Sequence, residues 1–223
     1  MSLSHVSLYM KPDSISAFTV SARYFSLGEI TISGPAGAIG QYQPYEYAID
    51  AGYARGISKY WSVGMNWKFI RSNLSGGLVT AGQQTFPGQA FAFDLSTYYR
   101  DRDRVKILGY PCTMMIGASL SNAGSKIKYA DTASGDFLPA NLRIGQGLEI
   151  NFGANNKVSF TYQANKLLVP TPPVYALDAN GKPIQTSPGH YQVVAGKDPN
   201  VPVIKGMLQS FSDAPGGAEE EFD

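Results

Sequence analysis

The stretch "WSVGMNWKF" (Trp61–Phe69) decides the fold of this chain. Every second residue is large and apolar, and those between are small or polar. The two sets are Trp61, Val63, Met65, Trp67 and Phe69, and Ser62, Gly64, Asn66 and Lys68. Because successive side chains of a β-strand point to opposite faces, the stretch predicts a strand with one apolar and one polar face.

The same alternation recurs along the chain. It extends over Phe18–Tyr24, Tyr45–Tyr53, Phe91–Ser96, Cys112–Leu120, Leu142–Ile150 (interrupted by Gln146) and Val158–Asn165, with a weaker first segment near Leu3–Lys11. This predicts about eight strands, each close to the ~10 residues of a membrane-spanning strand. The polar face carries few charges, at Arg23, Glu46, Asp50, Lys68, Asp94, Arg143 and Glu149, and suits a polar lumen or one packed by a plug.

The connections between these strands alternate in length. The short ones lie at Pro12–Asp13, Arg55–Tyr60 and Gly153–Lys157, and Arg100–Tyr110 is of medium length. The long ones cover 26–44, 72–88, 121–139 and everything from Leu167 to about Val203. The strands are therefore joined by short turns at one end of the sheet and by long loops at the other, as in outer-membrane barrels.

Alternation alone does not say whether the apolar face meets lipid or forms a soluble core. Aromatic residues bracket the strands, with Tyr60, Trp61, Tyr98 and Tyr99 near the short turns and Tyr24, Phe25, Tyr45 and Phe69 near the long loops. Since such rings favour both membrane interfaces, we predict an all-β, antiparallel up-and-down transmembrane barrel. A soluble β-rich structural domain remains the alternative.

Composition excludes several classes of function. Net charge is +1 and charged residues make up 16% of the chain, which does not indicate a nucleic-acid partner. A single cysteine, Cys112, rules out an internal disulfide. The uncharged run Ile107–Ser125 contains Pro111 and several polar residues, so it is not a lipid-embedded helix. The stretch after Met1, "SLSHVSLYMKPD", lacks a basic start and a long apolar run, so we expect no signal peptide there.

Motifs for catalysis or metal binding are weak. His5 and His190 lie at opposite ends of the chain, and neither G-x-S-x-G nor H-E-x-x-H occurs. We expect no enzyme activity, no cofactor and no metal. Three other stretches have simple interpretations: a loop for "GPAGAIG" (34–40), an Asn180–Gly181 turn for "LDANGKP" (177–183), and solvated charge at a turn for "RDRDR" (100–104).

An ordered set of motifs resembles the PorV family, also called LptO. The motifs are "SARYFSLGEI" (21–30), "IGQYQPYEYAIDAGYARGIS" (39–58), "SNLSGG" (72–77), "ASLSNAGSKIKYAD" (118–131), "FLPANLRIG" (137–145), "NKLLVPTPP" (165–173) and "IKGMLQSFSDAPGG" (204–217). The resemblance covers nearly the whole chain. No single motif is decisive, and it is their order that is specific.

The resemblance implies a FadL-like barrel of about fourteen strands in the bacterial outer membrane. Residues 1–223 would form a single domain, a central part of that barrel without its N-terminal and C-terminal strands. Family members are not enzymes. They bind the C-terminal signal domain of secreted cargo and carry it from the translocon barrel of the type IX secretion system to a sortase-like attachment complex. Outer-membrane lipid would be a further partner.

The long loops would be the partner-binding surface. Three prolines in "VPTPP" stop the last clear strand because proline lacks a backbone N–H, and they pre-order the loop beyond it. Candidate contact residues are Leu168, Val169, Pro170, Pro172, Pro173, Tyr175 and Tyr191. The alternative function is a FadL-type transporter of long-chain fatty acids or other hydrophobic compounds. It would need an apolar path through the lumen, and the charged polar face weakens it.

Overall fold

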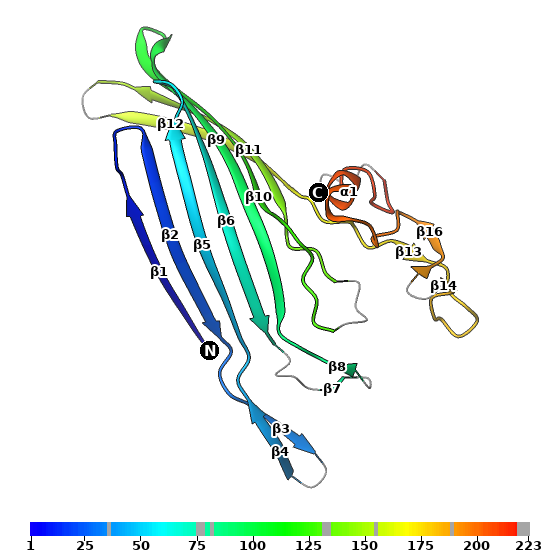
Figure 1. Ribbon diagram of the computed structural model, residues 1–223. Helices are drawn as coiled ribbons and strands as arrows, with labels where there is room; N and C mark the ends of the chain where they lie inside the picture. The colour runs from blue at the N-terminus through cyan, green and yellow to red at the C-terminus, as the bar shows by residue number, and fades with distance from the viewer. Residues whose placement is uncertain are drawn as a thin grey trace.

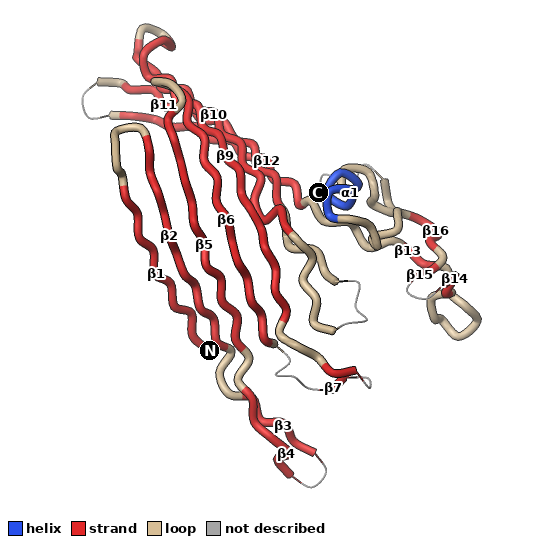
Figure 2. The backbone as a smooth tube through the Cα atoms, in the orientation of Figure 1, coloured by secondary structure: helices blue, strands red, loops and turns tan. Residues whose placement is uncertain are grey.

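The chain folds around one eight-stranded antiparallel sheet (Figures 1 and 2). The computed structural model describes residues 1–34, 37–74, 79–80, 83–130, 135–153, 156–187 and 190–217. The strands pair in chain order: β1 (Ser2–Met10), β2 (Ser16–Ser26), β5 (Tyr45–Gly56), β6 (Trp61–Asn73), β9 (Gly88–Ile107), β10 (Tyr110–Gly124), β11 (Asn141–Asn151) and β12 (Lys157–Leu167). The predicted strands and their up-and-down order are confirmed. Among the described residues β1 and β12 do not pair with each other, so the sheet is open.

The two ends of the sheet differ as the sequence predicts. At the short-turn end, Asp13 Oδ1 accepts a hydrogen bond from the backbone N–H of Ile15 at 2.9 Å and closes the first turn. This hydrogen bond from the backbone holds the pKa of the Asp13 carboxyl below its usual value. The long-loop end carries two extra hairpins: β3 (Ile30–Gly34) with β4 (Gly37–Tyr42), and β7 (Val79–Thr80) with β8 (Gln83–Gln84). Most of "GPAGAIG" lies in the first hairpin, and Pro35 and Ala36 lie outside the described residues.

One predicted turn is wrong. Arg100–Arg104 lies inside β9, which continues to Ile107, and the chain reverses at Leu108 and Gly109, with φ of 52° and 83°. A register shift between Cys112 and Met114 of β10 accommodates the extra β9 residues. Ladder hydrogen bonds use only the backbone, so alternating charge does not stop a strand. Cys112 itself is fully buried, with its Sγ 3.4 Å from the carbonyl oxygen of Tyr110.

Beyond β12 the chain forms a compact segment that we call the loop module, residues 168–217. It contains β13 (Val174–Tyr175), β14 (Gln185–Ser187), β15 (His190–Tyr191), β16 (Val193–Ala195) and α1 (Val203–Gln209). The alternation pattern does not predict α1, which is short and begins after Pro202 without a side-chain cap. No helix in the described part of the chain is long and apolar enough to cross a membrane.

The apolar face of the sheet is not a core. Its large side chains are exposed, with Trp67 at 58%, Phe91 at 67% and Phe160 at 63% of their full accessible surface. The buried apolar cluster is small and lies at the long-loop end, where Ala90, Ala92, Ile127 and Leu138 pack with Ile70 and Tyr129. Nothing in the described residues covers the apolar face.

The polar face is the hollow one. Two open hollows lie on it, one lined from β1 to β10 and one from β9 to β12, and Figure 1 shows the sheet curving. Small residues permit this curvature, because a Cβ on Gly64 would lie 2.8 Å from Ser96 Oγ on the next strand. Large side chains on one face and small ones on the other therefore match the curvature.

Gly124 and Gly117 of β10 give a matched test of this packing. A Cβ on Gly124 would overlap the carbonyl oxygen of Phe91 and lie 2.6 Å from Ala92 Cα, whereas one on Gly117 would make only ordinary contacts, with Tyr98 Cδ2 at 3.6 Å and the Thr97 carbonyl oxygen at 3.8 Å. We expect Gly124→Ala to lower the free energy of unfolding by about 1–3 kcal/mol or more. The measurement is a urea titration of the refolded protein followed by tryptophan fluorescence. The control, Gly117→Ala, should leave the midpoint nearly unchanged, and equal midpoints for the two variants would contradict this packing.

Candidate functional site

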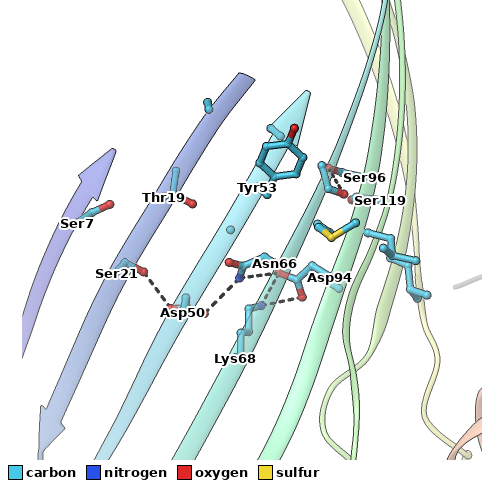
Figure 3. Close-up of a pocket in the computed structure, with 18 of the residues that line it drawn as sticks. Ser7, Thr19, Ser21, Asp50, Tyr53, Asn66, Lys68, Asp94, Ser96 and Ser119 are labelled. Atoms are coloured by element: carbon cyan, nitrogen blue, oxygen red, sulfur yellow. Dashed lines mark hydrogen bonds and ion pairs between the residues drawn. The ribbon is translucent and has the colours of Figure 1, made fainter. Parts of the chain in front are cut away.

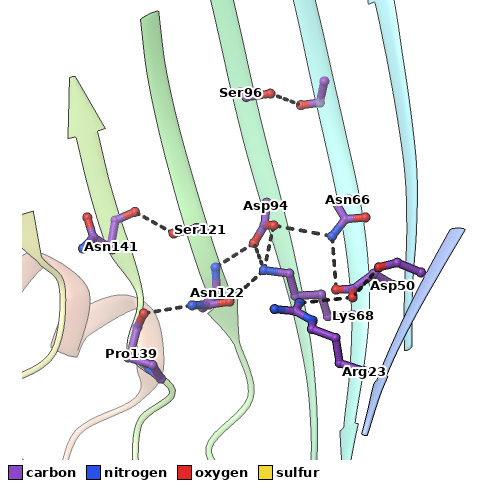
Figure 4. Close-up of polar contacts among 12 residues, drawn as sticks. Arg23, Asp50, Asn66, Lys68, Asp94, Ser96, Ser121, Asn122, Pro139 and Asn141 are labelled. Carbon is purple, nitrogen blue, oxygen red and sulfur yellow. Dashed lines mark hydrogen bonds and ion pairs between the residues drawn. The ribbon is translucent and has the colours of Figure 1, made fainter. Parts of the chain in front are cut away.

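A connected set of polar side chains crosses five neighbouring strands of the polar face (Figure 4). We call it the polar ladder: Ser21 and Arg23 on β2, Asp50 on β5, Asn66 and Lys68 on β6, Asp94 on β9 and Asn122 on β10. The strand register creates it, because Asp50 lies opposite both Ser21 and Lys68, and Asn66 lies opposite Asp94. Side chains directly opposite each other on one face of a sheet lie within reach of each other.

Asp50 is the centre of one half of the ladder. Its carboxylate is buried and accepts hydrogen bonds from Ser21 Oγ at 3.0 Å, Arg23 Nη2 at 3.2 Å and Asn66 Nδ2 at 3.4 Å. The Arg23 side chain is 51% exposed, so water screens this ion pair. Several donors rather than one strong partner therefore hold the Asp50 charge.

The other half is tighter. Lys68 Nζ lies 2.7 Å from Asp94 Oδ2 and donates to Asn122 Oδ1 at 2.8 Å. The Lys68 and Asp94 side chains are 12% and 24% exposed. The Asn122 backbone N–H donates to Asp94 Oδ1 at 2.8 Å, and its Nδ2 donates to the carbonyl oxygen of Pro139 at 3.1 Å. Asn122 therefore joins the ladder to the end of the connection between β10 and β11.

Asn122 is a residue that the alternation pattern misses, because it reads as the start of a loop. The residue lies at a register shift between Leu120 and Ala123 and has a φ of 56°, in the left-handed region. Asparagine tolerates this region better than most residues. The bulge turns its side chain toward Lys68, and the presence of asparagine in "LSNAG" is the only signal in the sequence.

The other predicted lumen residues share the polar face but not the ladder. Glu46 accepts a hydrogen bond from Ser72 Oγ at 2.6 Å, and Ser72 in turn accepts one from the Tyr129 hydroxyl at 2.9 Å. Glu149 pairs with Lys157 at 3.2 Å. Arg143 lines the second hollow. The structure thus brings Arg23, Asp50, Lys68 and Asp94 together. Glu46 lines a smaller hollow with Arg23 and Lys68, whereas Arg143 and Glu149 lie further along the sheet on β11.

The first hollow surrounds the ladder with hydroxyl groups. It has a volume of about 570 Å³ and is lined by His5, Ser7, Thr19, Ser96 and Ser119 as well as by ladder residues (Figure 3). Alternating charges and hydroxyls suit water or a polar ligand and offer no continuous apolar path. Within the described residues, no three His, Cys, Asp or Glu side chains gather closely enough to hold a metal ion.

Aromatic rings gather near both ends of the strands. Toward the long loops, neighbouring centroids lie 5.1–6.5 Å apart along the series Tyr24, Tyr45, Tyr47, Phe69 and Phe91. Near the short turns, Tyr99 lies 5.2 Å from Trp61 and 6.2 Å from Tyr60. Tyr98 differs, because it lines the second hollow on the polar face.

The predicted contact residues of the loop module divide into two groups. Leu168, Pro170 and Pro173 are buried, while Pro172 and Tyr191 are exposed and Val169 and Tyr175 are half-buried. The Leu168 N–H donates to the carbonyl oxygen of Ala140 at 2.7 Å, and the Thr171 N–H donates to Asp213 Oδ2 at 3.1 Å. The prolines thus lie in the packing of the module as well as at the end of β12.

Part of the loop module is a hairpin that closes at Asp178. The Asp178 N–H donates to the Lys182 carbonyl at 2.8 Å, and Asp178 Oδ1 accepts from the N–H groups of Asn180 and Lys182. Gly181 has a φ of 75°. The predicted Asn180–Gly181 turn is confirmed. The Asp178 carboxylate accepts hydrogen bonds from the backbone of this turn.

Taken together, this is an all-β protein with an uncovered apolar face, a polar hollow face and one elaborated end. The model of the family described as "Type IX secretion system protein PorV" matches residues 1–174, and the chain belongs to this family. It is therefore a component of the type IX secretion system. A search of curated proteins found no match.

The Lys68–Asp94 pair gives a graded test of the ladder. We expect Lys68→Met to cost about 2 kcal/mol of unfolding free energy, because it leaves the Asp94 carboxylate without its cation in a poorly solvated place. Arg23→Met should cost less than about 1 kcal/mol, because water screens that pair. Urea midpoints measure both. Adding Asp94→Asn to Lys68→Met should recover part of the loss, and simple additivity of the two losses would contradict the coupling.

Proposed function

We propose that this protein is a wall of an outer-membrane β-barrel whose apolar face contacts lipid and whose polar face lines the lumen. The exposure of Trp67, Phe91 and Phe160 supports this, since a soluble protein rarely leaves so large an apolar face uncovered. The aromatic rings near both strand ends support it too, because they favour the two membrane interfaces. The long-loop end would then lie at the cell surface.

At that surface, we propose, the protein binds the C-terminal signal domain of secreted cargo. The observation that carries this proposal is the loop module itself, which is folded and yet exposes apolar side chains. Val174, Leu177, Tyr191 and Val194 are 50%, 60%, 43% and 67% exposed. A pre-ordered surface loses little conformational entropy on docking, and exposed aromatic and apolar groups are typical of binding hot spots.

In the same proposal the protein is a carrier. It would receive cargo at the translocon barrel and deliver it to a sortase-like attachment complex. Membership of a type IX secretion family supports partners of this kind. A role as a carrier requires reversible binding, which suits a small exposed patch better than a large buried interface. No catalytic group is needed for this function.

A FadL-type transporter of hydrophobic compounds has less support. Such a transporter needs an apolar path, and the first hollow carries both members of the Lys68–Asp94 pair together with Asp50. Moving an alkyl chain past these groups would separate them from their polar partners, at a cost in free energy. Saturable uptake of fatty acids by the full-length protein, without cargo binding, would favour the transporter.

Cysteine labelling along β6 tests the lipid face. Single cysteines at Val63, Met65 and Trp67 should react with a membrane-soluble maleimide in reconstituted full-length protein, because their side chains share the apolar face. Cysteines at Gly64 and Asn66 line the hollow and should react with a water-soluble reagent instead. The native Cys112 is fully buried and provides the background. Equal labelling of all five positions by both reagents would contradict the assignment.

A pull-down with the C-terminal domain of a secreted cargo tests the binding surface. We expect Tyr191→Ser combined with Val194→Ser to weaken binding about tenfold or more, because two exposed apolar contacts are lost. The matched control is Leu108→Ser, which removes a side chain that is 91% exposed at the opposite end of the sheet. It should bind like the unchanged protein. Normal binding by the double variant would place the cargo surface elsewhere.

A further inference from the structure

Asn122 connects the polar ladder to the end of the β10–β11 connection. Three of its polar groups are used: the backbone N–H on Asp94, the side-chain oxygen on Lys68, and the side-chain nitrogen on the Pro139 carbonyl. The first two contacts face the hollow and the third reaches the end of the β10–β11 connection (Figure 4). A residue held in the left-handed region by three partners has little freedom to adopt another conformation.

From Pro139 the contacts continue into the loop module. The Ala140 carbonyl accepts the hydrogen bond of Leu168, the first residue of the module. Phe137, two residues before Pro139, packs on α1, because a Cβ on Gly206 would lie 2.6 Å from its ring and 3.0 Å from Pro170 Cγ. At position 206 of α1, any side chain larger than that of glycine would overlap the Phe137 ring.

A cation also contacts that ring. Lys126 Nζ lies 4.2 Å from the centroid of Phe137, and burial lowers the pKa of this lysine, while neighbouring Asp136 opposes the change. Phe137 therefore lies close to both Lys126 and Gly206. The path from Lys68 to α1 consists of hydrogen bonds through Asn122 to Pro139, the short backbone segment 137–139, and the packing of Phe137 on α1.

We infer that Asn122 positions the loop module. The contacts that Lys68 and Asp94 make inside the hollow would then determine where the module lies relative to the sheet. Energetic coupling of this kind needs a continuous set of packed and hydrogen-bonded groups that both ends share. A charged group that entered the hollow and competed for Lys68 or Asp94 would loosen Asn122 and, through it, the module. The inference concerns the position of the module and does not require that the module binds cargo.

Hydrogen exchange read by mass spectrometry on the reconstituted full-length protein tests the inference. Asn122→Gly keeps the left-handed backbone and removes both side-chain contacts. We expect amide exchange to rise about tenfold or more in peptides covering 135–140 and 168–177, the latter including the N–H groups of Leu168 and Thr171. Phe137→Ala should raise exchange in the module alone and leave the strands around Lys68 protected, because it breaks the path beyond Asn122.

The matched control is Arg23→Met, which breaks an ion pair of the same ladder that has no contact with the β10–β11 connection. It should leave exchange in the module unchanged. If Asn122→Gly gives no folded protein, Asn122→Asp takes its place, since it keeps the acceptor for Lys68 and lacks the donor to Pro139. Unchanged module exchange in the Asn122 variant, or an equal rise with Arg23→Met, would overturn the inference.

Discussion

The antiparallel register of the eight strands is the constraint on which the rest of the structure depends. Pairing each strand with its neighbour in the chain places the polar ladder on one side and most of the large apolar residues on the other. A slip of one residue would turn a whole strand over and put its charges on the apolar face. The polar ladder, the aromatic rows and the hollows are all consequences of this register.

The two faces of the sheet differ in how their side chains are stabilised. The apolar face is uncovered and rich in large side chains, so it requires an apolar environment. The polar face must satisfy its own charges, and it does so across strands rather than along them, as Asp50 does with three donors from the two neighbouring strands β2 and β6. Small residues such as Gly64 let neighbouring strands curve without a clash on that side. Together these properties give the sheet one uncovered apolar face and one polar, hollow face.

The long-loop end of the sheet carries the loop module. The Leu168 N–H ties the loop module to Ala140, just before β11, and its helix α1 lies against Phe137 of the β10–β11 connection, so the position of the module relative to the strands is defined. Its outward residues, such as Tyr191 and Val194, present an apolar surface on a rigid support. Membership of a type IX secretion family gives this surface a context, because proteins of such a system meet other proteins. The strands thus hold the loop module in place, and the module presents the exposed apolar surface.

Much of this was open to prediction from the sequence, because side-chain alternation with a period of two is a local property of a strand. "WSVGMNWKF" alone assigns β6, and the short and long connections follow from where such stretches end. Local patterns were less informative where backbone pairing ignores side-chain charge, as at Arg100–Arg104, and where a turn of helix stands alone, as at α1.

What the sequence by itself determined is therefore the strands, their faces and the uneven ends, since each depends on residues close together in the chain. Only the tertiary structure decided which polar residues meet. Lys68, Asp94 and Asn122 come together through cross-strand register and a bulge, and neither can be read from one strand. The burial of Pro170 and Pro173 was decided in the same way, because Pro170 lies against Gly206 of α1 and Pro173 against Gly196, both far along the chain.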